Sequence, residues 1–157
     1  MEIQMALYLP RDAVSVPVTR QVLDRSMETL GVTSDTRADI ALALSEACAN
    51  VVQHAEPGED YEVRVGVRNC KCVIEVVSAG GTDSETGDEL LAGLAVAGRP
   101  VPATAEHGRG LTIIDAVADN LQLRANERAG ATVHFEKTLD WLPGAPGRQL
   151  FQVHPGG

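Results

Sequence analysis

The sequence predicts an α+β fold, a two-layer sandwich in which helices cover a mixed or antiparallel sheet. Hydrophobic and polar residues alternate in five short segments, which is the period of a half-buried strand. In three longer segments, hydrophobic residues recur every three or four positions, which is the period of an amphipathic helix. These segments follow one another in the order β-α-α-β-β-loop-α-β-β, and this order is typical of an α+β domain.

The length and composition fit one acidic globular domain. The chain has 157 residues, and 44% of them are hydrophobic. Aromatic residues make up only 3%, so Val, Leu, Ile and Ala must fill the core. The net charge of −9 argues against a direct nucleic-acid partner and against an anionic membrane surface, because both require a positive protein surface.

The sequence also predicts a cytoplasmic location. No hydrophobic run approaches the roughly 20 residues of a membrane span, and the N-terminal segment lacks the features of a signal peptide. The cysteines Cys48, Cys70 and Cys72 are odd in number and match no disulfide framework. Cys70 and Cys72 lack the second pair of ligands that a zinc site needs, so we expect them to have structural or surface roles.

The first third of the chain predicts one strand and two helices. Residues 3–9 alternate as a strand does. The following helix is capped by Asp12 and ends at Gly31, a residue that readily adopts the left-handed conformation after a helix. A second helix begins at residue 34 or 35 and continues to His54 with one hydrophobic stripe.

The middle of the chain predicts a hairpin and a long irregular segment. Residues 61–67 and 72–77 alternate and are joined by a short link, which predicts antiparallel pairing. Residues 78–109 are rich in Gly, Ala, Thr and acidic residues, and an interior segment of this length is normally functional. We expect a short helix at 90–96 within it and a longer helix that begins at Gly110.

The C-terminal part predicts two more strands and a tail. Residues 120–124 and 131–139 have strand character and are joined by a turn. The remaining residues contain several Pro and Gly and show no periodicity, which indicates disorder. We therefore expect one domain over residues 1–140 and a disordered tail over residues 141–157.

The second predicted helix carries the first candidate functional group. Glu46 and Asn50 are four residues apart, so both project from one side of the helix, and His54 follows one turn later. An Asn oxygen can ligate Mg²⁺, and a nearby carboxylate can orient or deprotonate a nucleophile at a phosphoryl group. The same spacing also occurs on ordinary solvated helix faces, and His54 at a helix C-terminus can simply interact with the helix dipole.

The segment from Glu106 to Leu111 is the second candidate. Gly108 and Gly110 permit a close approach of the backbone to a ligand, and the N-terminus of the following helix attracts phosphate. Arg109 adds positive charge at the same place. An ordinary turn and helix start would account for the segment equally well.

Two further positions carry weaker signals. Ser78 and Gly80 follow a predicted strand directly, and glycines at a strand end mark either a ligand-facing turn or a bend. Thr132 lies at the start of the last predicted strand, where an inward hydroxyl could reach a nucleotide base or a water molecule. Taken alone, each position is compatible with a purely structural role.

Taken together, these segments resemble the histidine-kinase-like (GHKL) ATPase fold. Within that fold, the chain resembles the small anti-sigma factor serine/threonine-protein kinases of bacteria over roughly residues 3–140. The block from Glu46 to His54 is the most specific part and matches the N box of that family. The resemblance is carried by residues 43–55, 78–81, 107–111 and 130–132.

The resemblance implies a site for ATP and Mg²⁺. Glu46 would be the general base that activates a serine hydroxyl, and Asn50 would ligate the Mg²⁺ between the ATP phosphates. Residues 108–111 would form the second glycine box beneath a lid at about residues 82–106, and Thr132 would lie near the adenine. The nucleotide-binding residues implied in this way are Asn50, His54, Ser78, Gly80, His107, Gly108, Arg109, Gly110, Leu111 and Thr132.

The resemblance also implies partners. Such proteins form homodimers, sequester a sigma factor and phosphorylate a STAS-domain anti-anti-sigma factor on serine. Arg20, on the first predicted helix, is a candidate for partner contact, although an exposed arginine is more often only solvated.

The first glycine box departs from the family pattern. Ser78 occupies the position of an aspartate that accepts a hydrogen bond from adenine, and Thr82 occupies that of the last glycine. A neutral acceptor is worth about half of a charged one, so we expect ATP affinity to fall by roughly one or two powers of ten. A degenerate member that binds a sigma factor or STAS protein without catalysis is therefore one alternative. A regulatory ATPase unrelated to sigma factors is another.

Overall fold

The computed structural model describes residues 2–54, 60–78, 106–126 and 130–151. The order of elements predicted from the sequence is confirmed, with one additional helix near the C-terminus. The expected helix at 90–96 and the expected lid, apart from Glu106, lie outside the described residues. The elements are β1 (Glu2–Pro10), α1 (Ser15–Leu30), α2 (Ser34–His54), β2 (Asp60–Arg68), β3 (Lys71–Ser78), α4 (Glu106–Val117), β4 (Asn120–Asn126), β5 (Gly130–Thr138) and α5 (Pro146–Phe151).

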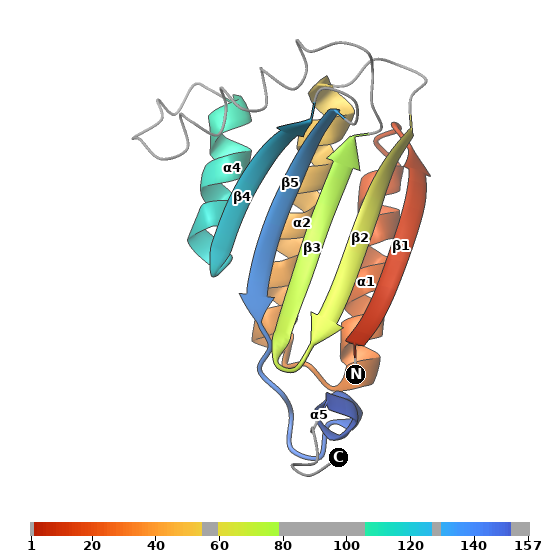
Figure 1. Ribbon diagram of the computed structural model, residues 1–157, viewed down its shortest axis with the longest axis vertical. Helices are drawn as coiled ribbons and strands as arrows, with labels where there is room; N and C mark the ends of the chain where they lie inside the picture. The colour runs from red at the N-terminus through yellow and green to blue at the C-terminus, as the bar shows by residue number, and fades with distance from the viewer. Residues whose placement is uncertain (1, 55–59, 79–105, 127–129, 152–157) are drawn as a thin grey trace.

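The five strands form one antiparallel sheet in the order β1-β2-β3-β5-β4. Helices α1, α2 and α4 lie on one face of this sheet, and its other face is uncovered in the described part of the chain (Figure 1). The predicted hairpin is confirmed: β2 and β3 join through Asn69 and Cys70, and Asn69 has a positive φ of 55°. The α+β two-layer fold is therefore confirmed, with an entirely antiparallel sheet.

The core lies between the helices and the covered face of the sheet. Alternate residues of β2 and β3 are buried there, among them Val63 and Ile74. Leu44 and Ala47 of α2 pack against them with no exposed surface. This alternation is why aliphatic side chains can fill the core of a chain with few aromatic residues. Among the described helices, none is long and apolar enough to cross a membrane.

Helix α1 ends where the sequence predicts. Gly31 adopts a φ of 91°, and its N–H donates to the carbonyl of Glu28 at 3.0 Å. At the other end, the expected cap by Asp12 is not made: Val14 is the N-cap residue and no side chain caps the helix, and the Asp12 carboxylate instead accepts a hydrogen bond from the backbone N–H of Val14 at 3.1 Å. Helix α4, in contrast, begins at Glu106 instead of Gly110, so the glycine-containing segment forms its first turns.

The expectation of a disordered tail from residue 141 is wrong for residues 141–151. Helix α5 forms there, and the ring of Trp141 stacks on Phe151 with a centroid distance of 6.3 Å. The N–H of Leu142 donates to the carbonyl of Gly31 at 2.8 Å, which fixes the segment to the turn between α1 and α2. A helix of six residues is too short to show periodicity, and its few apolar residues find their partners only in the folded chain.

Candidate functional site

The structure brings three of the expected site residues together where α2 and α4 pack. Gly110 of α4 faces Glu46 and Asn50 of α2. A methyl group at Gly110 would lie 3.0 Å from Glu46 Oε2 and 3.3 Å from both Asn50 Oδ1 and Nδ2. Because glycine has no side chain, the α4 backbone approaches these two polar groups without displacing them.

Asn50 is the most unusual residue at this contact. It is only 4% exposed, and its Nδ2 atom has no hydrogen-bond partner among the described residues. Buried amide groups are nearly always paired, so an unpartnered donor here indicates a place for an external acceptor. A phosphate oxygen is such an acceptor, and the amide oxygen of the same side chain is a ligand type that Mg²⁺ prefers. Asn50 therefore fits a site for Mg²⁺ and phosphate.

Glu46 lies beside Asn50 and is less buried. Its side chain is half-buried, one turn before Asn50 on the same side of α2. The packing of the hydrophobic stripe of α2, which includes Leu44 and Ala47, on the sheet leaves this polar side facing α4. The arrangement places a carboxylate where a molecule bound at Asn50 and Gly110 can meet it.

Ser78 lies on the helix-covered face at the end of β3. It is 2% exposed and pairs in register with Tyr61 of β2. Tyr61 in turn hydrogen-bonds the thiol of Cys48, two residues from both Glu46 and Asn50. Ser78 thus belongs to the same end of the covered face as the α2–α4 contact.

A buried polar network behind the site was not predicted from the sequence. The Tyr61 hydroxyl and Ser15 Oγ are 2.6 Å apart, and Thr19 Oγ1 donates to the carbonyl of Ser15 at 2.8 Å. Burial raises the pKa of Tyr61 and that of Cys48 to about 12, so both groups stay neutral. The network connects the start of α1 to β2 and α2. Two hydroxyl residues four apart on the inner side of α1 are the signal that could have revealed it.

The structure describes several of the remaining predicted site residues only in part. Residues 107–109 belong to the first turn of α4, and His54 is the last residue of α2; their side chains lie outside the described part. Leu111 is 1% exposed and packs in the core, so it anchors α4. Gly80 lies outside the described residues.

The expectation that Thr132 points inward is not met. In β5, Val133 and Phe135 are buried in the core, so the alternation places Thr132 with His134 on the uncovered face of the sheet. This face is opposite to that of Glu46 and Asn50. The reason is the period of two in a strand: one position of difference reverses the direction of a side chain.

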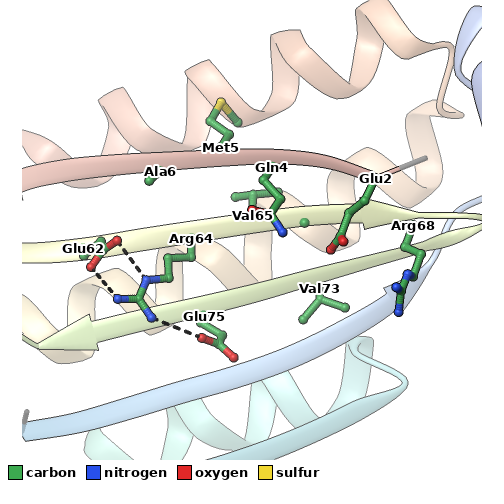
Figure 2. A pocket seen from close by; sticks show the side chains of 11 residues that line it. Glu2, Gln4, Met5, Ala6, Glu62, Arg64, Val65, Arg68, Val73 and Glu75 are labelled. Carbon is green, nitrogen blue, oxygen red and sulfur yellow. Dashed lines mark hydrogen bonds and ion pairs between the residues drawn. The ribbon is translucent and has the colours of Figure 1, made fainter.

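The uncovered face has a hollow of its own, shown in Figure 2, with a volume of about 520 Å³. Three of the charged residues that line it are paired with one another: Arg64 donates to both carboxylate oxygens of Glu62, at 2.8 and 3.0 Å, and lies 4.0 Å from Glu75. The bonds from Arg64 hold the pKa of Glu62 below its usual range. We therefore interpret this hollow as a group of solvent-facing charged side chains on the sheet, separate from the candidate site.

Comparison with known proteins agrees with this arrangement. The sequence pattern of the histidine kinase-like ATPase domain matches residues 9–137. The chain therefore belongs to the histidine kinase-like ATPase family, as the resemblance of the Glu46–His54 block predicted.

Within this family, the chain is similar to serine-protein kinases named RsbW. It is 31% identical over 137 residues to RsbW of Bacillus velezensis, which covers 84% of this chain and 83% of the relative. It is 32% identical over 138 residues to RsbW of Bacillus pumilus, with the same coverage of both chains. A solved chain of the SiaB–SiaC complex from Pseudomonas aeruginosa has the same fold, with a TM-score of 0.59 and 14% identity over 87% of this chain and 88% of that one.

Proposed function

We propose that this chain is a cytoplasmic anti-sigma factor that binds Mg²⁺-ATP, sequesters a sigma factor and phosphorylates a STAS-domain anti-anti-sigma factor on serine. The contact of Glu46 and Asn50 with Gly110 is the observation that carries the proposal. The similarity to RsbW serine-protein kinases supports serine as the acceptor. Arg20, exposed on α1, is a candidate for contact with a partner.

The proposal gives each residue at the α2–α4 contact a role in binding. The first turn of α4 provides backbone N–H groups for the ATP phosphates, and Gly110 keeps that turn close to α2. The Nδ2 group of Asn50 donates to a phosphate oxygen, and its Oδ1 is the atom that would ligate Mg²⁺. When bound, Mg²⁺ neutralises charge on the phosphates. Ser78 accepts a hydrogen bond from the adenine amino group.

Glu46 acts in the transfer step. Its carboxylate takes the proton from the serine hydroxyl of the substrate protein as that oxygen attacks the γ-phosphorus. A bond forms between the serine oxygen and phosphorus, the bond from phosphorus to the leaving oxygen of ADP breaks, and the proton remains on Glu46. A half-buried position suits this role, because the serine belongs to another protein and must reach the carboxylate.

A second candidate function is partner binding without catalysis. The observation that favours it is Ser78, a neutral residue where the family has a carboxylate for adenine. Weaker recognition of adenine would leave a protein that holds its partners without transferring phosphate.

Calorimetry with Mg²⁺-ATP, followed by transfer of labelled phosphate to a STAS-domain protein, separates these functions. For a kinase, Glu46→Gln keeps nucleotide affinity within about threefold but lowers the transfer rate by about 100-fold or more. Glu2→Gln, an exposed change on the far face of the sheet, is the control and leaves both unchanged. Transfer that persists in Glu46→Gln contradicts the assigned base. Tight partner binding with no measurable nucleotide affinity supports the second function.

A further inference from the structure

A chain of buried hydrogen bonds lies behind the candidate site. Ser15 Oγ donates to the carbonyl of Asp12 at 2.6 Å, and a hydroxyl has only one proton to donate. The Tyr61 hydroxyl, 2.6 Å from Ser15 Oγ, is therefore the donor in that contact, and its oxygen accepts from the thiol of Cys48. The hydrogen bonds thus run in one direction, from Cys48 through Tyr61 and Ser15 to Asp12, and each side chain in the chain has a partner.

This hydrogen-bond chain joins segments that are far apart in the sequence. Asp12 precedes α1, Ser15 is the first residue of α1, Tyr61 lies in β2 and Cys48 lies in α2. These parts of the molecule meet towards the end where β3 finishes (Figure 1). Tyr61 is 1% exposed and Cys48 has no exposed surface, so the hydrogen bonds are shielded from water.

Buried polar side chains gather at this end of the described structure. Ser15, Thr19, Asn50 and Ser78 are buried here, and Thr36, near the opposite end of α2, is the remaining one among the described residues. An apolar replacement of the same shape costs little stability when both hydrogen-bond partners are replaced. Hydrogen bonds depend on direction, whereas apolar contacts do not, so a fully paired buried network fixes the relative positions of the elements that it joins.

The nucleotide of the proposed function would contact two separate elements. Asn50, which would contact the phosphates, is in α2, and Ser78, which would contact the base, is at the end of β3. Tyr61 is linked to both. It lies directly opposite Ser78 in the β2–β3 register, where paired residues point to the same face of the sheet. Its hydroxyl hydrogen-bonds Cys48, which precedes Asn50 by two residues in α2.

We propose that Tyr61 is a positioning residue for nucleotide binding and that its hydroxyl fixes the separation of Asn50 from Ser78. This inference rests on the proposed function, which assigns the phosphates to Asn50 and the base to Ser78. A ligand that is held at two points binds more tightly than its separate parts only when the two points keep the spacing of the ligand. Loss of the hydroxyl lets α2 and β3 shift relative to each other, so it weakens the binding of the intact nucleotide more than that of either part.

Calorimetry of Tyr61→Phe with three ligands tests the proposal. The ligands are Mg²⁺-ATP, Mg²⁺-tripolyphosphate and adenosine. We expect the affinity for Mg²⁺-ATP to fall about tenfold, and the affinities for tripolyphosphate and for adenosine to stay within about threefold. Tyr8→Phe changes the other tyrosine of the chain, which is exposed on the uncovered face of the sheet. This matched control should leave all three affinities unchanged.

Two substitutions at Cys48 separate positioning from packing. Cys48→Ser keeps a donor for the Tyr61 hydroxyl, whereas Cys48→Ala removes it. We expect the serine variant to bind Mg²⁺-ATP within about threefold of the unchanged protein, and the alanine variant to bind it about tenfold more weakly. Urea unfolding measures the stability of both variants. A purely structural role would instead make the affinity for ATP follow the free energy of unfolding.

The results distinguish a failure of this inference from a failure of the proposed function. If the unchanged protein has no measurable affinity for Mg²⁺-ATP, both are overturned. If Tyr61→Phe keeps its affinity for ATP, or loses affinity equally for all three ligands, only the role of Tyr61 is overturned. Binding that depends on Tyr61 as expected, without phosphate transfer to a STAS-domain protein, supports the role of Tyr61 and contradicts only the proposed catalysis. Circular dichroism checks the fold of each variant, and if Tyr61→Phe does not fold, the two Cys48 variants decide.

Discussion

Adding a methyl group at Gly110 should change the stability of the fold and the affinity for ATP in opposite directions. Alanine favours a helix over glycine by about 1 kcal/mol, which should keep or raise the free energy of unfolding of Gly110→Ala. The same methyl group would lie 3.0 Å from Glu46 Oε2 and would displace that carboxylate. We expect ATP affinity to fall about tenfold or more in calorimetry while stability to urea holds. Gly66→Ala, on the uncovered sheet face, is the control, and an equal loss of affinity there would contradict the assignment.

Ser78 allows a test of the adenine contact. Ser78→Asp restores a charged acceptor, so ATP should bind about tenfold more tightly, and discrimination against GTP should increase. Because position 78 is only 2% exposed, the added carboxylate should also lower the free energy of unfolding without nucleotide. Calorimetry and urea unfolding of the same variant measure both effects. Unchanged ATP affinity would remove Ser78 from the site.

The buried thiols predict a loss of stability in alkali. Burial raises the pKa of Cys48 and Cys72 from about 9 to about 12, so the folded chain keeps protons that the unfolded chain loses. Below about pH 9 the thiols are protonated in both the folded and the unfolded chain, so they do not change the free energy of unfolding. As the pH rises from about 9 to about 12, only the unfolded chain loses these protons, so the free energy of unfolding should fall across that range. Urea unfolding at several pH values measures the decline. At pH 8, thiol labelling should modify the exposed Cys70 and spare the other two; equal labelling of all three would contradict this account.

At the scale of elements, long periodic segments were predictable and short or irregular ones were not. The stripe of α2 and the alternation of β2 and β3 extend over enough residues to identify each element. The glycines of the 107–111 segment suggested a loop, but α4 already begins at Glu106. Helix α5 was missed because a six-residue helix depends on tertiary contacts, here with Trp141 and with the end of α1, and these contacts leave no pattern in the sequence.

The packing of α5 leads to a prediction at this scale. A methyl group at Gly147 would lie 2.5 Å from Trp141 Cζ3 and 2.9 Å from the carbonyl oxygen of Leu30, so Gly147→Ala must displace α5. We expect a loss of about 1–3 kcal/mol in the free energy of unfolding. Gly144→Ala is the matched control: its φ of 72° disfavours alanine, but no atom lies within 4 Å. Urea unfolding should therefore show a smaller loss of about 1 kcal/mol for this control. Equal losses would mean that α5 does not pack against Trp141.

At the scale of the whole molecule, the fold determines which predicted residues meet. The spacing on α2 was enough to place Glu46 and Asn50 on one side of a helix, but not to choose between a site and a solvated face. Gly110 follows Asn50 by 60 residues in the sequence. The packing of α4 against α2 brings Gly110 to these two side chains, and this contact favours a site over a solvated face. Thr132 is the opposite case. The sequence predicts that it lies near the nucleotide, but its side chain in β5 points to the uncovered face of the sheet, away from Glu46 and Asn50.

Asn50 connects the site to the stability of the whole molecule. A buried amide donor without a partner costs stability in the free protein, so Asn50→Ala should leave the free energy of unfolding unchanged within about 1 kcal/mol or raise it. Nucleotide at 100 times its dissociation constant stabilises a folded protein by about 2.7 kcal/mol, which corresponds to about 5–10 °C in melting temperature for a chain of this length. This shift should require Mg²⁺ and should disappear in Asn50→Ala, as thermal unfolding with Mg²⁺-ATP and with ATP plus EDTA can measure. If Asn50→Ala instead melts far below the unchanged protein and keeps the shift, Asn50 is a packing residue and the nucleotide binds elsewhere.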